Sequence, residues 1–190
     1  KPERVILVGV NEGGDEKEVR ESLDELGELV KTAGAEPVAV LVQNREKIHP
    51  GTYIGKGKIE ELRNAISLSQ ATGIVCDDEL SPAQLKNLEQ ELETKVMDRT
   101  LIILDIFAGR AMTREGKIQV ELAQLKYRQT RLTGFGTAMS RLGGGIGTRG
   151  PGEKKLEMDR RLIKSRIAAL NQELKEVKRH REVTREQRSK

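Results

Sequence analysis

The sequence predicts an α/β fold: a small parallel β-sheet of about four strands flanked by helices, followed by a long antiparallel α-helical hairpin with coiled-coil character. Over the first hundred residues, short β-rich apolar runs alternate with segments of helical periodicity, an order typical of parallel sheets with helices on their faces. A glycine-rich stretch then separates two helical segments, and the second has apolar residues in a heptad pattern. We expect two domains, an α/β domain over residues 1–112 and the hairpin over 113–190.

Four runs rich in apolar and β-branched residues predict the strands, over residues 5–10, 37–42, 73–77 and 94–97. Between them, apolar residues recur at helical spacing and predict helices over 16–33, 58–68 and 82–92. Gly34 favours a stop for the first of these helices. Ser81 followed by Pro82 indicates an N-cap and a first helical residue for the third.

The character of the chain changes after residue 100. Residues 101–111 predict a buried helix, and residues 117–132 a second one with Ile118, Leu122, Leu125 and Leu132 along one side. Residues 133–152 include eight glycines and predict a loop. Residues 153–187 predict a helix roughly 50 Å long. Its seam residues are Leu156, Ile163, Ile167, Leu170, Leu174 and Val177. Two helices joined by one loop predict an antiparallel pair with the loop at its tip.

Charge is distributed unevenly along the chain. The 190 residues have a net charge of +4, but residues 1–109 have a net charge of −8 and residues 110–190 of +12. Such asymmetry favours a nucleic-acid partner for the basic half. The alternative is a solvated, Lys/Arg-rich helix without a partner.

The composition also excludes several classes of protein. No apolar run approaches the roughly 18–20 residues of a membrane helix, so we expect no membrane span. A single cysteine, Cys76, excludes an internal disulfide framework and fits a reducing cytoplasm. We expect a cytoplasmic monomer. With one cysteine and two distant histidines, a zinc site is not expected.

The loop over residues 133–152 is the most informative segment for function. It contains a formal G-x-G-x-x-G at Gly145, Gly147 and Gly150, but the dinucleotide fingerprint must follow a strand, and this one follows a predicted helix. A plain linker would be richer in serine. A tip that inserts into an RNA cavity would use glycines for close approach and arginines for phosphate contacts and base stacking. The candidate RNA contacts are Arg141, Gly143, Gly144, Gly145, Gly147, Arg149, Lys154 and Lys155, with Arg160, Arg161 and Lys164 just below the tip.

A second glycine-rich patch covers residues 51–58. It fails the Walker A spacing but opens a predicted helix, whose N-terminal N–H groups could hold an anion. The candidates for anion or RNA-phosphate binding are Gly55, Lys56, Gly57 and Lys58. Plain turn chemistry is the alternative.

Three adjacent carboxylates, Asp77, Asp78 and Glu79, follow the third predicted strand. The carboxyl edge of an open parallel sheet is where ligands bind, so these groups could hold a metal or act as acid and base. A capping turn ahead of Ser81 is the simpler interpretation. Since no His, Cys or Ser nucleophile accompanies them, we assign no catalytic residue.

Several longer motifs occur in one order along the chain. They are residues 51–62 (GTYIGKGKIEEL), 98–100 (DRT), 104–111 (LDIFAGRA), 119–127 (QVELAQLKY), 142–153 (LGGGIGTRGPGE) and 157–161 (EMDRR). Together they resemble the N-terminal region of the HflX family of GTPases, over essentially all 190 residues. The resemblance implies a C-terminal GTPase domain beyond the basic last helix. No Walker A sequence occurs in these residues, so GTP and Mg²⁺ are expected in that domain and no cofactor in this chain.

The resemblance also implies partners and a role. Members of the family bind the large ribosomal subunit, and bacterial members split stalled or idle ribosomes under stress, with the glycine loop reaching toward the peptidyl-transferase centre. The implied partners are therefore 23S rRNA and the chain's own GTPase domain. Some members show ATP binding or RNA unwinding attributed to this region, which makes an ATP-binding RNA remodeller one alternative. A regulatory domain that controls the GTPase domain is another.

Overall fold

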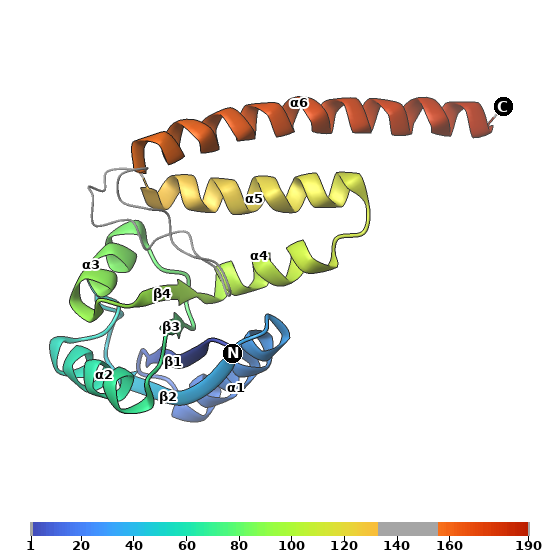
Figure 1. The fold of residues 1–190 in the computed structure, drawn as a ribbon. Helices are drawn as coiled ribbons and strands as arrows, with labels where there is room; N and C mark the ends of the chain where they lie inside the picture. The colour runs from blue at the N-terminus through green and yellow to red at the C-terminus, as the bar shows by residue number, and fades with distance from the viewer. Residues whose placement is uncertain (1, 133–155, 190) are drawn as a thin grey trace.

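The structure, a computed structural model, describes residues 2–132 and 156–189, and within them the chain forms a four-stranded sheet (Figure 1). The strands are β1 (Arg4–Asn11), β2 (Glu36–Asn44), β3 (Gly73–Cys76) and β4 (Lys95–Asp98). They pair in the order β2-β1-β3-β4, and each pairing is parallel. The predicted parallel sheet is confirmed. Because the chain passes from β1 to one side for β2 and to the other for β3, the carboxyl ends of β1 and β3 meet at a topological switch point.

Helices cover both faces of the sheet. The first face is covered by α1 (Glu16–Thr32) and α4 (Arg99–Arg110), and the second by α2 (Lys56–Ser69) and α3 (Pro82–Leu92). Alternation along β1 supplies both cores, because successive side chains of a strand point to opposite faces. Val5 and Leu7 belong to the core under α1 and α4, whereas Ile6 and Val8 belong to the core under α2 and α3.

Local signals set where three helices begin. The side chains of Asp15, Ser81 and Asp98 each accept a backbone N–H from the first turn of α1, α3 and α4, which satisfies donors that have no partner within the helix. Ser81 and Gln84 form a reciprocal capping box, so the predicted start at Ser81 is confirmed. Gly34, just after α1, has a φ of +97°, a conformation that glycine adopts without strain.

Two long helices complete the described chain, α5 (Arg114–Leu132) and α6 (Leu156–Ser189). Figure 1 shows α5 between α4 and α6, and the packing of α5 on both neighbours agrees with this view. Arg166 of α6 pairs with the middle of α5, whereas Glu173 and Arg181 pair with its first turn, so the middle of α6 lies beside the N-terminal end of α5 and its last turns project past it (Figure 1). The ion pairs are Arg166 with Glu121 at 3.0 Å, Glu173 with Arg114 at 2.6 Å and Arg181 with Glu115 at 2.8 Å.

The predicted seam of α6 packs into the core. Ile163 and Leu170 are buried, and Ile167, Leu174 and Val177 pack against the same apolar cluster. That cluster includes apolar residues of α5, of the sheet, of α2 and of α3, so the long helices share a core with the α/β part. The loop over 133–152 lies outside the described residues. The antiparallel hairpin with its tip, its coiled-coil character and the domain boundary at 112 therefore stay predictions.

The helix predicted over residues 101–111 differs from the structure in two respects. It begins at Arg99, because Asp98 at the end of β4 caps it. It is also only partly buried: Leu101 and Ile102 are in the core, whereas Phe107 is 56% exposed. The first turns of α4 therefore cover the sheet and the last turns lie at the surface. The other predicted helices and strands occur with boundaries shifted by a few residues.

Across residues 2–132 and 156–189, no helix has the combination of length and apolar composition that crossing a membrane requires.

Candidate nucleic-acid interface

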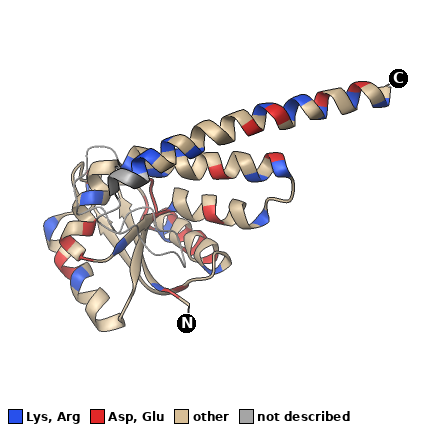
Figure 2. Ribbon diagram, turned by 45° about the horizontal axis from the view of Figure 1, so that its top comes forward, with Lys and Arg blue, Asp and Glu red and all other residues tan. Residues whose placement is uncertain are grey.

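Basic side chains gather where α5 ends and α6 begins. We call this group the basic end, and its members are Lys126, Arg128, Arg160, Arg161 and Lys164. Lys126, Arg161 and Lys164 are exposed, and Arg128 and Arg160 are half-buried. Figure 2 shows Lys and Arg concentrated at this end of α6. The structure thus brings three of the predicted RNA contacts, Arg160, Arg161 and Lys164, together with two cations of α5.

Helical periodicity explains why these α6 side chains face solvent. Ile163 and Leu170 turn toward the core, and positions 161 and 164 lie off that seam. From residue 160 to residue 172, α6 has no Asp or Glu. The cations in this stretch therefore have no acidic partner one turn further along their own helix.

Ion pairing is uneven along α5 and α6. Arg114, Arg166 and Arg181 are each paired with a glutamate of the other helix. Lys126, Arg161 and Lys164, by contrast, form no ion pair with the side chains of residues 2–132 and 160–189, which are those that the structure describes. Exposed cations without carboxylate partners create a positive potential that attracts phosphate groups.

A buried polar cluster fixes the last turn of α5 to the sheet. Arg131 is buried, and its Nη2 donates to the Leu80 carbonyl oxygen at 2.7 Å and lies 3.8 Å from Asp98 Oδ2. Its guanidinium carbon lies 3.4 Å from the centroid of the Tyr127 ring. Asp98 is fully buried and accepts backbone N–H bonds from Leu80 at 2.9 Å and Leu101 at 3.0 Å. The end of α5 from which residues 133–155 continue is therefore held rigidly.

Burial raises the pKa of Asp98, and its two backbone N–H bonds and the Arg131 charge oppose that rise. Burial also raises the pKa of Tyr127 well above the ordinary range of a phenol. Sequence reasoning missed Arg131 and Tyr127, because their partners are remote in sequence. The capping role of Asp98 could have been predicted from the sequence, because an aspartate between a strand and a helix is a typical N-cap.

In the acidic run after β3, Asp77 and Asp78 accept hydrogen bonds from neighbouring side chains. Asp77 accepts hydrogen bonds from Arg99 Nη2 at 2.7 Å and Ser22 Oγ at 2.6 Å, and Asp78 accepts one from the Tyr53 hydroxyl at 2.6 Å. Partial burial raises the pKa of Asp78, opposed by the Tyr53 bond. Within the described ranges, no group of three or more His, Cys, Asp or Glu side chains could hold a metal ion. These two carboxylates therefore organise the switch-point loop.

Residues 51–58 form an ordered turn ahead of α2. Gly55 is the N-cap residue, and its N–H donates to Gln43 Oε1 at 2.7 Å. A Cβ atom at Gly55 would lie 2.5 Å from Arg45 Nη1, so a larger residue here would have to displace the Arg45 side chain. Tyr53 is buried with a φ of +67°. The strained backbone of Tyr53 is thus held by its burial and its bond to Asp78.

The predicted anion site has only part of the geometry it needs. Lys56 and Gly57 are exposed at the start of α2, but Lys58 is paired with Glu61 at 3.0 Å. Turn chemistry accounts for Gly55, and anion binding by Gly55, Lys56, Gly57 and Lys58 stays a prediction.

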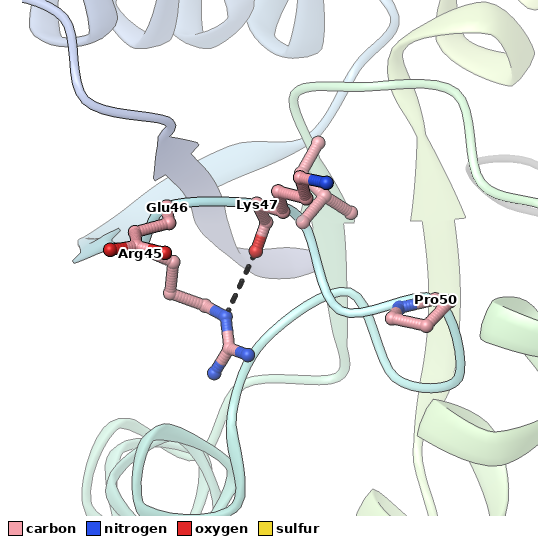
Figure 3. Close-up of a pocket in the computed structure, with 5 residues that line it drawn as sticks. Arg45, Glu46, Lys47 and Pro50 are labelled. Carbon is pink, nitrogen blue, oxygen red and sulfur yellow. Dashed lines mark hydrogen bonds between the residues drawn. The ribbon is translucent and has the colours of Figure 1, made fainter.

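An open pocket of about 560 Å³ lies next to this turn (Figure 3). Its lining residues are Arg45, Glu46, Lys47, Ile48 and Pro50. Arg45 Nε donates to the Lys47 carbonyl oxygen at 3.1 Å, which orients the guanidinium. The pocket presents both cations and the Glu46 carboxylate, so its charge does not favour an anion alone.

The other predicted RNA contacts lie outside the described residues. They are Arg141, Gly143, Gly144, Gly145, Gly147, Arg149, Lys154 and Lys155.

Two family models match the chain in succession. One, described as a GTP-binding GTPase N-terminal region, matches residues 20–108, and the other, described as a GTP-binding GTPase middle region, matches residues 110–188. The GTPase HflX of Lacrimispora saccharolytica is 71% identical over 188 residues, which are 99% of this chain and 44% of that protein. The GTPase HflX of Escherichia coli K12 is 47% identical over 170 residues, 90% of this chain and 40% of that protein. The chain spans less than half the length of these curated relatives.

Solved structures have a similar fold. The complex of SsGBP with GDP superposes with a TM-score of 0.66 at 23% identity, over 95% of this chain and 45% of that chain. A GTP-binding protein of the archaeon Sulfolobus solfataricus in complex with GDP superposes with a TM-score of 0.58 at 22% identity, over 92% of this chain and 46% of that chain. At these identities the similarity concerns the fold alone.

Proposed function

The chain belongs to the HflX family of GTPases, and from this we propose that it is the ribosome-binding N-terminal region of such a GTPase. In this proposal it binds the large ribosomal subunit through 23S rRNA and dissociates stalled or idle ribosomes, acting as a monomer in the cytoplasm. GTP hydrolysis and its Mg²⁺ belong to a C-terminal GTPase domain outside these residues.

The basic end is the observation that carries the proposal. Lys126, Arg161 and Lys164 are exposed and have no carboxylate partner among the described side chains, those of residues 2–132 and 160–189, although glutamates pair with other cations of the same two helices. Exposed cations of this kind gain most by displacing the counterions condensed on a nucleic-acid backbone. An RNA partner would therefore account for the cluster of exposed cations at the basic end.

The proposed path of the chain places its tip beyond this end. We take α5 and α6 as the arms of an antiparallel hairpin, with the loop over residues 133–152 reaching toward the peptidyl-transferase centre. Glycines in the loop would allow close approach to RNA, and arginines would contact phosphates and stack on bases. The Arg131–Asp98 cluster supports this role, because it orients the arm from which the loop departs. The tip contacts would be Arg141, Gly143, Gly144, Gly145, Gly147, Arg149, Lys154 and Lys155.

Co-sedimentation of the protein with large ribosomal subunits across a salt series tests the proposal. In the double variant Arg161→Gln/Lys164→Gln, we expect the slope of log affinity against log salt to fall by about two units, because each lost phosphate contact removes about one. The matched control is Lys175→Gln/Lys178→Gln, which removes two exposed cations from the other half of α6. Equal slopes for the double variant and the unmodified protein would contradict the assignment of the basic end.

The structure does not favour the alternative of an ATP site at the acidic run, because Asp77 and Asp78 are occupied by Arg99, Ser22 and Tyr53. A regulatory role toward the GTPase domain is compatible with ribosome binding, since two-domain coupling is usual in such switches.

A further inference from the structure

The strand β2 forms an open edge of the sheet. In the part of the chain that the structure describes, it pairs with β1 alone, and α1 and α2 pack on its two faces. An open edge offers backbone N–H and C=O groups to another chain, so proteins usually shorten such strands or place charged residues on them. The opposite edge strand, β4, has only four residues and begins at Lys95. By contrast, β2 has nine residues, and none from 37 to 43 is charged.

The regular part of this edge begins at Ala39. Pro37 has no N–H to offer, and the pairing of β2 with β1 shifts register just before Ala39. Both features discourage another strand from pairing with the start of β2. From Ala39 to Asn44 the register with β1 is regular. A partner strand therefore has a regular stretch of six residues on which to lie.

The N–H groups of Val40 and Val42 point to the open side of this stretch. Arg45, the residue after β2, donates its N–H to the carbonyl oxygen of Asn11 in β1 at 2.9 Å. Because backbone N–H groups alternate in direction along a strand, those at positions 40 and 42 point away from β1. The side chain of Val40 is also 42% exposed. The edge thus combines outward backbone donors with an exposed apolar side chain.

The open pocket described above directly follows β2 (Figure 3). Two of its lining residues, Arg45 and Lys47, are cations, and one, Glu46, is a carboxylate. The bond from Arg45 Nε to the Lys47 carbonyl oxygen orients the guanidinium. A segment that lies along β2 and continues past the end of the strand would reach these cations. The excess of positive charge there favours an acidic side chain next to the apolar run of such a segment.

The open edge lies away from the basic end. In the sheet, β2 and β4 are at opposite sides, and the chain continues from β4 into α4 and α5. Figure 1 accordingly shows β2 on the side of the sheet that faces away from α5 and α6. RNA bound at the basic end would leave β2 accessible. The edge therefore indicates a partner other than the RNA.

We propose that residues 39–44 of β2 bind an extended segment of another protein, which adds to the sheet as a fifth strand. The segment consists of apolar, β-branched residues next to an acidic residue that lies against Arg45 and Lys47. In strand addition, main-chain hydrogen bonds supply affinity, and pockets beside the strand supply specificity. The proposal does not rest on ribosome binding.

Binding of a fluorescent peptide to the full-length protein, followed by fluorescence anisotropy, tests the strand addition. The probe alternates threonine and valine and has an aspartate at each end, so that either direction of pairing brings an aspartate to Arg45 and Lys47. Two further versions carry N-methyl groups at alternate residues, in complementary sets, and each set removes the donors on one side of the peptide. We expect one set to abolish binding and the other to leave it intact. Equal binding of the two sets, or no saturable binding of the probe, would overturn the proposal.

Exchange of the aspartates tests the acidic position. Replacement of both by asparagine should weaken binding about threefold at low salt, because the exposed cations at the end of β2 contribute modestly and are screened by salt. Equal affinities of the two peptides would overturn the assignment of Arg45 and Lys47.

A substitution in β2 locates the contact. Val40→Pro removes one outward donor and leaves the hydrogen bonds between β2 and β1 in place, which circular dichroism checks. We expect the probe to bind this variant about fivefold more weakly, as the loss of one hydrogen bond implies. The matched control Val40→Thr keeps the N–H and should leave the affinity unchanged. Equal affinity of the proline variant and the unmodified protein would overturn the site. A dimer in sedimentation velocity that Val40→Pro abolishes would also overturn it, because a second copy would then be the occupant.

Discussion

Two buried charged side chains of this protein connect separate elements of the fold. Asp98 and Arg131 are both buried and come from β4 and α5, and Asp98 also caps α4. One carboxylate thereby connects a strand, the helix after it and the arm that leads to residues 133–155. Such a pair is costly to desolvate and is retained only with good hydrogen bonds, which Leu80 and Leu101 supply here.

Removal of one partner should destabilise the fold strongly. For Arg131→Met we expect a loss of about 3–5 kcal/mol in the free energy of unfolding, because Asp98 is left buried without its cation. Urea unfolding followed by circular dichroism measures this loss. Lys126→Met, which removes an exposed cation of the same helix, should change the free energy by less than about 0.5 kcal/mol. A similar loss in the free energy of unfolding for the two variants would contradict the stabilising role of the buried pair.

The raised pKa of Asp98 has a consequence for pH dependence. Its native pKa lies above the unfolded value, so the native state binds more protons in the interval between the two values. The contribution of this group to stability therefore increases as pH falls through the raised native pKa toward about 3.9, the ordinary value, and is lost as pH rises.

Comparison with Asp98→Asn isolates this contribution. As pH is lowered from neutrality, the stability of the unmodified protein should improve relative to that of the variant, in urea titrations at a series of pH values. The exposed Asp24→Asn on α1 controls for the removal of one negative charge. A difference between protein and variant that stays constant with pH would contradict the raised pKa.

At the scale of the elements, α6 depends on its seam. Its described residues make their principal helix–helix contact with α5, and among them Ile163 and Leu170 are buried. The three ion pairs along the contact are exposed, and exposed pairs contribute at most about 1 kcal/mol each. Apolar burial therefore dominates the attachment of α6.

Truncation within the seam should loosen the helix. Leu170 is 1% exposed, and we expect Leu170→Ala to cost about 2–5 kcal/mol through lost burial and the cavity that remains. Limited trypsin digestion should then cleave α6 sooner at Lys175 and Arg179. Leu162, on the same helix but 60% exposed, is the control, and Leu162→Ala should leave the digestion unchanged. Equal digestion of the two variants would contradict the role of the seam.

Most elements were predictable because their signals are local. The apolar runs, the Ser81 cap and the seam of α6 each occupy a few helical turns or a single strand, and the structure contains all of them. The prediction for residues 101–111 was wrong in the degree of burial, because the composition of this segment is mostly apolar. Composition does not report which side of an apolar helix has a neighbour, and Phe107 has none that covers it.

At the scale of the whole molecule, the charge split along the sequence becomes a spatial separation. The acidic N-terminal half forms the sheet and its helices, and its carboxylates are partly used internally, as at Asp77 and Asp98. In the basic half, cations near Glu115, Glu121 and Glu173 are paired. Lys126, Arg161 and Lys164, which have no such pair with the side chains of residues 2–132 and 160–189, lie at the basic end, where Lys and Arg are concentrated (Figure 2). This end is where we propose that RNA binds.

A shared core links that end to the sheet. One apolar cluster contains residues of β1, α2, α3, α5 and α6, and the Arg131–Asp98 pair adds a polar connection. Movement of the arm relative to the sheet would therefore break buried contacts. We infer that the arm and the sheet move as one body.

The amino-acid sequence by itself determined the strands, the helices, the parallel sheet, the seam and the uneven charge, because each depends on the order and spacing of neighbouring residues. Only the tertiary structure decided which side chains pair with one another through hydrogen bonds and charge. Asp78 meets Tyr53, Asp77 meets Arg99 and Asp98 meets Arg131 across 25, 22 and 33 positions of sequence. No periodicity encodes such pairs, since packing of separate elements brings them together. The same packing decided which cations and apolar residues remain at the surface to meet a partner.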